Sequence, residues 1–268
     1  MNNQTDFNNN WRKVAATIYK KPSDSKIFGT VEIDVTELEK YISDKRKEGL
    51  KITLTHVIVL IVARALKQEV PELNTYVKRG NIVHRNYVDA TVSVLLPGGR
   101  MGSVKVKDAD NLTLKEIVDL MSGEIKKSRK GDENSTMQSK HLLASIPWPF
   151  RNWVFRLYKM FTIDWGISLP FLGLNSDSFG SFVISNIGSI GLDMGYPSLL
   201  PSSNVAFVMI MGGIYKKPVV VNDEIVVRRI MSLGAALDHR VTDASQGGKL
   251  FRFIKYMVKN PELLEEKP

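Results

Sequence analysis

Two patterns of apolar residues alternate along the chain. Short segments rich in β-branched or alternating apolar residues predict strands at 31–35, 88–96, 102–106, 181–185, 205–211 and 225–233. Apolar residues at helical spacing predict helices at 11–21, 53–69, 113–130 and 244–259. This mixture favours an α/β fold, a two-layer sandwich in which helices cover a mixed β-sheet, within a single domain spanning residues 1–268.

Five polar residues, at the start of or within predicted helices, carry specific interpretations. Thr36 and Glu39 have the spacing of a capping box at the start of a helix. The segment 53–69 is apolar nearly all round, but Arg64 and Lys67 interrupt it before it reaches membrane-spanning length, so it predicts a buried helix. We therefore interpret His56, inside this segment, as a packed or hydrogen-bonded core histidine and not as a ligand.

Residues 131–180 differ in composition from the rest and form an aromatic insertion. A polar stretch at 131–140 precedes eight aromatic residues: Trp148, Phe150, Trp153, Phe155, Tyr158, Phe161, Trp165 and Phe171. A helix over 149–162 would place an apolar stripe on one side and Asn152, Arg156 and Lys159 on the other. Packing against the protein itself or a partner subunit is the favoured interpretation, and peripheral membrane contact through 148–171 is the alternative.

Charge and composition narrow the possible partners. The 37 Lys and Arg exceed the 28 Asp and Glu, a net charge of +9 that suits an anionic partner. No helix-turn-helix, zinc or aromatic-platform motif accompanies this charge, so we expect no nucleic-acid partner. The chain has no cysteine and its four histidines are dispersed, so no metal site is predicted. The polar N-terminus carries no secretory signal pattern, and the expected location is cytoplasmic.

One loop has the arrangement expected of a catalytic site. His239 lies in the segment 238–243 (DHRVTD), between a predicted strand and the last predicted helix. Rigid elements often hold catalytic side chains on such loops. Imidazole is suited to take a proton from a thiol or hydroxyl near neutral pH and to return it.

The run 231–243 (MSLGAALDHRVTD) resembles the active-site signature of the 2-oxoacid dehydrogenase acyltransferase catalytic domain, His-x-x-x-Asp-Gly preceded by Asp. Ala244 stands where that signature has glycine. The chloramphenicol acetyltransferases have a related signature. Further similarity at 12–15, 54–74, 182–188 and 259–264 extends the resemblance over most of the chain, with no clear counterpart for 131–180.

The resemblance implies a chloramphenicol acetyltransferase-like fold and assigns roles to four residues. It makes His239 the general base and Ser185 the donor that stabilises the oxyanion. It makes Asp243 a scaffold carboxylate whose partner is Arg12, with Lys13 as the alternative match.

The same resemblance implies the substrates and the assembly. The expected reaction moves an acyl group between coenzyme A and a thiol, such as a dihydrolipoyl group, or another acceptor. We expect no metal and no covalently bound lipoyl group on this chain, so a lipoyl domain would come from another polypeptide. The expected assembly is a homotrimer with active sites between subunits. The alternative is a catalytically silent relative that serves assembly or membrane docking.

Overall fold

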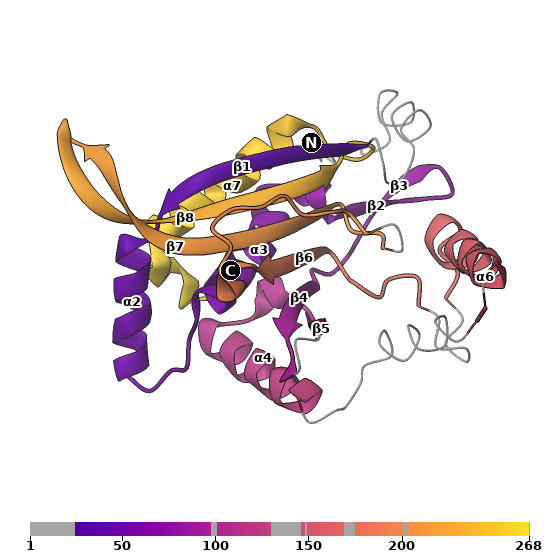
Figure 1. The fold of residues 1–268 in the computed structure, drawn as a ribbon, viewed down its shortest axis with the longest axis horizontal. Coiled ribbons are helices and arrows are strands. Elements are labelled where there is room, and N and C mark those ends of the chain that lie inside the picture. The colour runs from indigo at the N-terminus through magenta and orange to yellow at the C-terminus, as the bar shows by residue number, and fades with distance from the viewer. Residues whose placement is uncertain are drawn as a thin grey trace, which may run out of the picture.

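A computed structural model describes residues 25–97, 101–129, 146–147, 149–168, 175–200 and 203–267. Its centre is one six-stranded sheet with the strand order β1-β8-β7-β6-β4-β5 (Figure 1). The strands are β1 (Lys26–Asp34), β4 (Ala90–Leu95), β5 (Met101–Val106), β6 (Phe182–Asn186), β7 (Phe207–Val221) and β8 (Glu224–Asp238). The predicted helix at 11–21, and Arg12 within it, lie outside the described residues.

The sheet is mixed, as predicted. β6 pairs in parallel with both β4 and β7, whereas β1 with β8, β7 with β8, and β4 with β5 are antiparallel. Parallel neighbours need long crossover connections, and the chain between β4 and β6 includes both a helix and the aromatic insertion. This topology places the middle of the sequence beside its C-terminal strands.

Helices cover one face of the sheet, which confirms the two-layer architecture. The helices are α2 (Thr36–Lys47), α3 (Leu54–Gln68), α4 (Leu114–Arg129) and α7 (Ala244–Lys259). Most of α3 is buried in the main core, together with Phe182 and Ile184 of β6. The intervening Val183 points to the other face, where a smaller cluster includes Leu199 and Val208.

His56 is a structural residue, as predicted. Its Nδ1 accepts a hydrogen bond from the backbone N–H of Thr53 at 3.1 Å, at the start of α3. Burial, and to a lesser degree the charge of Arg46, lower the pKa of His56 from 6.5 to about 4.

The capping box predicted for Thr36 and Glu39 is wrong. The residue before α2 is Val35, and the Thr36 N–H donates instead to Asp34 Oδ1 at 3.0 Å. The Glu39 carboxylate pairs with Arg229 of β8 at 2.8 Å. The Glu39 carboxylate therefore binds the Arg229 guanidinium, from a strand distant in sequence, and does not accept a hydrogen bond from the backbone at the start of α2.

Two features of the strands were not predicted. A small hairpin of β2 (Thr75–Lys78) and β3 (Asn81–His84) stands apart from the main sheet. β7 and β8 are both 15 residues long, well beyond the predicted 205–211 and 225–233, and their joined ends form an arm that projects past α2 (Figure 1). The predicted strand 225–233 includes the arm part of β8; the prediction missed residues 212–221 of β7, most of which lie in the arm, and residues 234–238 of β8, which are buried.

The aromatic insertion contains α6 (Phe150–Tyr158), which continues as a π-helical turn, η4 (Lys159–Asp164). α6 lies at one end of the molecule, away from α2 and α4 (Figure 1). Phe150, Trp153 and Leu157 are exposed, so packing against the chain itself is wrong for these three side chains, and packing against a partner subunit stays a prediction. None of the described helices is long and apolar enough to cross a membrane.

Candidate active site

The His239 loop is a tight connection between β8 and α7. The Asp238 carbonyl accepts hydrogen bonds from the backbone N–H groups of Val241 and Thr242, each at 3.1 Å. The N–H of His239 donates to the carbonyl of Ser25, just before β1, at 2.6 Å. These bonds fix the backbone on both sides of the imidazole.

A buried ion pair holds the same loop from within. The Arg240 guanidinium donates through Nε to both carboxylate oxygens of Asp238, at 2.9 and 3.1 Å, and the Arg240 backbone N–H also reaches Asp238 Oδ1. Both side chains are buried. We did not assign roles to Asp238 and Arg240 from the sequence, although the Asp-x-Arg spacing around His239 was visible there.

The His239 ring is oriented by the loop itself. Its Nδ1 lies 2.8 Å from the backbone oxygen of Thr242 and 3.4 Å from Asp243 Oδ1. A carbonyl oxygen only accepts, so Nδ1 carries the proton in this contact. In the neutral ring the Nε2 lone pair is then the basic site. The side chain is 30% exposed, which leaves the imidazole accessible to a substrate.

Asp243 stands immediately before α7, and its carboxylate approaches the same Nδ1 atom of the His239 ring. Its N–H donates to Gln246 Oε1 at 2.9 Å, which ties the residue to the first turn of the helix. Its φ of −114° is extended, and Ala244 begins α7 without a positive φ. The loop therefore accommodates alanine where the resembling signature has glycine.

Ser185 lies near the end of β6, beside Ser93 of β4 and Ile210 of β7. By strand alternation its side chain shares the face of Val183, opposite the main helical layer. Asn186, the next residue, donates to Thr55 Oγ1 at 3.2 Å and so ties the strand end to α3. The Ser185 hydroxyl forms no hydrogen bond with the described part of the chain, so it is available to donate.

One chain does not bring His239 and Ser185 together. Phe182, Phe207 and Leu237 lie side by side across β6, β7 and β8. Ser185 is three residues beyond this row in one direction, and His239 is two residues beyond it in the other. At about 3.3 Å per residue and about 4.8 Å between strands, the two backbones are roughly 19 Å apart. They cannot act on the same carbonyl unless two chains combine.

Arg12, the proposed partner of Asp243, lies outside the described residues. Within the described ranges no cluster of three His, Asp or Glu side chains could hold a metal ion.

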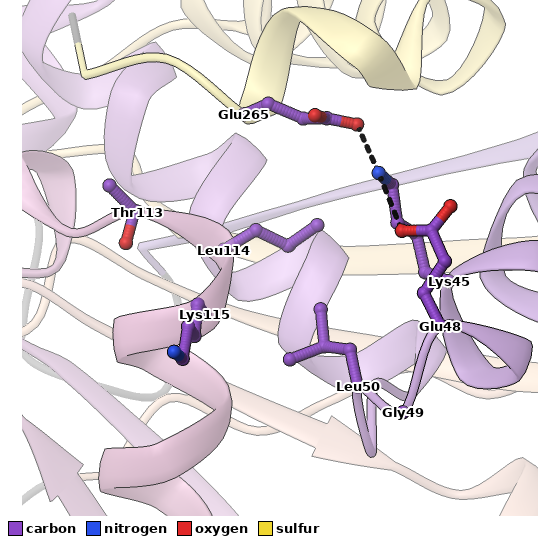
Figure 2. Close-up of a pocket in the computed structure, with 8 residues that line it drawn as sticks. All are labelled: Lys45, Glu48, Gly49, Leu50, Thr113, Leu114, Lys115 and Glu265. Carbon is purple, nitrogen blue, oxygen red and sulfur yellow. Dashed lines mark hydrogen bonds and ion pairs between the residues drawn. The ribbon is translucent and has the colours of Figure 1, made fainter.

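A surface cavity of about 580 Å³ lies far from His239, between the end of α2, the start of α4 and the C-terminal segment (Figure 2). Lys45 pairs there with Glu265 at 2.8 Å and with Glu48 at 3.2 Å. β1 separates this region from His239, since α2 follows the end of β1 that is remote from Asp238. Because the cavity is remote from His239, we assign it no part in the chemistry.

The sequence matches the 2-oxoacid dehydrogenases acyltransferase (catalytic domain) family over residues 8–140 and 174–265. It is 26% identical over 264 residues to the dihydrolipoyllysine-residue acetyltransferase component of the pyruvate dehydrogenase complex from Rickettsia bellii, covering 96% of this chain and 53% of that protein. It is 24% identical over 260 residues to a mitochondrial dihydrolipoyllysine-residue succinyltransferase component of the 2-oxoglutarate dehydrogenase complex from Arabidopsis thaliana, covering 94% and 47%. The chain thus spans about half the length of these relatives.

Solved structures show the same fold. A probable dihydrolipoamide acetyltransferase from Listeria monocytogenes superposes with a TM-score of 0.65 at 22% identity, covering 93% of this chain and 88% of that one. The cubic core of the pyruvate dehydrogenase multienzyme complex superposes with a TM-score of 0.66 at 16% identity, covering 94% of this chain and 87% of that one. A chloramphenicol acetyltransferase superposes with a TM-score of 0.52 at 11% identity, covering 92% of this chain and 94% of that one. The family match over most of the sequence, on this fold, shows that the chain belongs to the 2-oxoacid dehydrogenase acyltransferase catalytic-domain family.

Proposed function

We propose that this protein is an acyltransferase that moves an acyl group between coenzyme A and a thiol. The observation that carries the proposal is the His239 ring, whose Nδ1 is held by the Thr242 carbonyl so that Nε2 is the basic atom. A thiol of pKa near 8.5 is only a few per cent ionised at neutral pH, so a positioned base accelerates its attack.

The proposed reaction begins when Nε2 of His239 takes the proton of the acceptor thiol. The thiolate attacks the thioester carbonyl of acyl-CoA, forming a new C–S bond and placing negative charge on the carbonyl oxygen. The Ser185 hydroxyl donates to that oxygen. The intermediate collapses with cleavage of the C–S bond to coenzyme A, and the imidazolium returns the proton to the departing thiolate.

Asp243 has a supporting role in this scheme. The Nδ1–H of the ring lies 3.4 Å from the Asp243 carboxylate, and the ring becomes a cation when Nε2 takes the thiol proton. Negative charge there stabilises the protonated ring that forms during the reaction. In the proposed site, Arg12 is the counter-ion of Asp243, with Lys13 as the alternative.

We propose a homotrimer in which His239 of one chain faces Ser185 of another. The separation of roughly 19 Å within one chain supports shared sites. Large apolar side chains exposed on the segment after β6 and on β1 would be covered by such an assembly: Phe28, Ile190, Leu192, Met194 and Tyr196. The structural similarity to the cubic core of a multienzyme complex is compatible with this assembly.

The proposed acceptor is a dihydrolipoyl group carried by a lipoyl domain of another polypeptide. The support is that the curated relatives are named for acetyl and succinyl transfer to dihydrolipoyllysine. The test measures coenzyme A release from acetyl-CoA and succinyl-CoA, with dihydrolipoamide as the acceptor. Acceptor-dependent release that His239→Ala abolishes is expected.

The rival function is a silent scaffold that serves assembly or membrane docking. Its specific support is the exposed apolar stripe of α6. Folded, trimeric protein that releases no coenzyme A with either acyl donor would favour the scaffold over the enzyme.

A further inference from the structure

The helix α6 carries an apolar stripe that faces solvent. Phe150, Trp153, Val154 and Leu157, here called the α6 stripe, are spaced i, i+3, i+4 and i+7 and so share one side of the helix. They are 65, 67, 42 and 44% exposed. The family match stops at residue 140 and resumes at 174, so α6 lies outside it and the family's shared chemistry does not account for the stripe.

The segment that carries the α6 stripe is attached to the rest of the protein by buried residues and by a backbone hydrogen bond. Thr162 and Ile163 of η4 are buried, and Phe155 and Tyr158 of α6 are half-buried. The N–H of Arg79, in the turn between β2 and β3, donates to the Asp164 carbonyl at 2.9 Å. The exposure of the stripe therefore belongs to a helix seated on the protein body.

Charge around the stripe has one sign. Arg151, Arg156 and Lys159 are the only charged residues from 142 to 163, and Asp164 is the first acid after them. Arg151 and Arg156 are exposed; Arg151 Nε donates to the Ile146 carbonyl at 2.9 Å, and Lys159 lies 3.8 Å from Asp164. An apolar stripe flanked by arginines complements a surface that is apolar inside and anionic outside.

The aromatic composition of this region suits a lipid surface. Trp153 and Trp165 are both exposed, and tryptophan is enriched where a membrane meets water. The sequence on either side of the helix, 142–149 and 165–174, carries no charge, so the apolar character continues past the stripe. A helix of nine residues is too short to cross a bilayer but suits its interface.

We propose that the α6 stripe, with Arg151 and Arg156, docks this protein on an anionic lipid surface, with the helix lying in the plane of the interface. The partner is a membrane leaflet that presents acidic headgroups. Docking does not require catalysis, so it can be tested in an inactive His239→Ala protein.

The experiment is co-sedimentation with vesicles of phosphatidylcholine alone and of phosphatidylcholine mixed with phosphatidylserine. The full chain should sediment with the acidic vesicles, less so at high salt. Trp153→Ser combined with Leu157→Ser should weaken partitioning by about tenfold or more. Arg151→Gln combined with Arg156→Gln should remove most of the salt-sensitive part of the binding to acidic vesicles.

Matched controls come from α7, whose exposed face is also aromatic and basic. Tyr256→Ser, and Arg252→Gln combined with Lys255→Gln, should leave vesicle binding unchanged. Absence of binding to acidic vesicles, or equal losses in the controls, would overturn the proposal. A change in oligomer mass caused by the stripe variants, with vesicle binding unchanged, would assign the surface to another copy. If the stripe variants lose acyl transfer and keep vesicle binding, the α6 stripe is a lid over the acceptor site and the docking proposal is overturned.

The two proposals fail separately in this design. If His239→Ala protein still binds vesicles through the stripe, docking stands whether or not acyl transfer is found. If acyl transfer is found and no variant affects binding, the enzyme stands and docking fails.

Discussion

The Nδ1 atom of His239 lies 2.8 Å from the backbone oxygen of Thr242, three residues later in the same loop. Because that oxygen accepts only, the loop selects the tautomer in which Nε2 is basic. The Asp238–Arg240 pair and the bond from His239 N–H to Ser25 hold the backbone that makes this contact possible.

Replacing His239 with alanine should lower turnover by about two to four orders of magnitude, because the base that ionises the thiol is lost. The partly exposed side chain is not a core element, so circular dichroism should show an intact fold. His84→Ala, at an exposed histidine of β3, is the matched control and should retain activity. Equal turnover in folded His239→Ala protein would remove the central assignment.

Ser185→Ala should reduce kcat by roughly two to three orders of magnitude with little change in KM, because the hydroxyl acts on the transition-state oxyanion. Steady-state kinetics over a range of acyl-CoA concentrations separates the two constants. Ser93→Ala, at the neighbouring position of β4, should change kcat only a few-fold. A raised KM with unchanged kcat would identify Ser185 as a ground-state contact.

Mixed trimers of His239→Ala and Ser185→Ala chains should recover activity. When each site takes one residue from each of two chains, random mixing of equal amounts makes roughly a quarter of the sites complete. Co-expression with two different affinity tags isolates the mixed assemblies for assay. If verified mixed trimers are no more active than either parent, each site is built within one chain, despite the distance along the sheet.

Arg240→Ala should destabilise the fold by about 3–5 kcal/mol, because it leaves the buried Asp238 carboxylate without a counter-charge. The double variant Asp238→Asn with Arg240→Met should lose less stability than Arg240→Ala, since it leaves no buried charge uncompensated. Urea unfolding of the three proteins measures both effects. A double variant less stable than Arg240→Ala would contradict this explanation.

Stability should fall on acidification through His56. Its pKa is about 4 in the folded protein and near 6.5 when unfolded, so the unfolded chain binds more protons between these values. The contribution is present above pH 6.5 and is lost as the pH falls toward 4, by about 3 kcal/mol. His56→Gln keeps an acceptor for the Thr53 N–H but does not titrate. Wild type should therefore lose about 3 kcal/mol more than this variant between pH 7 and 4, and an equal loss would exclude His56 as the cause.

The sequence by itself determined the elements whose signals are local. The apolar period of α7 predicted Ala244–Lys259 to the residue, and the apolar patterns at 88–96 and 102–106 predicted β4 and β5 to within two residues at each end. The strand that carries Ser185 and the loop that carries His239 were also predicted, because each has an apolar pattern and a polar end within a few residues. The resemblance to a family then supplied the roles, which no periodicity could.

Only the tertiary structure decided which distant residues meet. The separation of His239 from Ser185 depends on the register of three strands, and the hydrophobic pattern of one strand says nothing of its offset from a neighbour. The pairing of Glu39 with Arg229 replaced a local cap for the same reason, since a guanidinium brought close by folding competes with a backbone N–H nearby in sequence. The aromatic stripe of α6 was visible in the sequence, but its exposure was not, because helical spacing reports which residues share a side and not what covers that side.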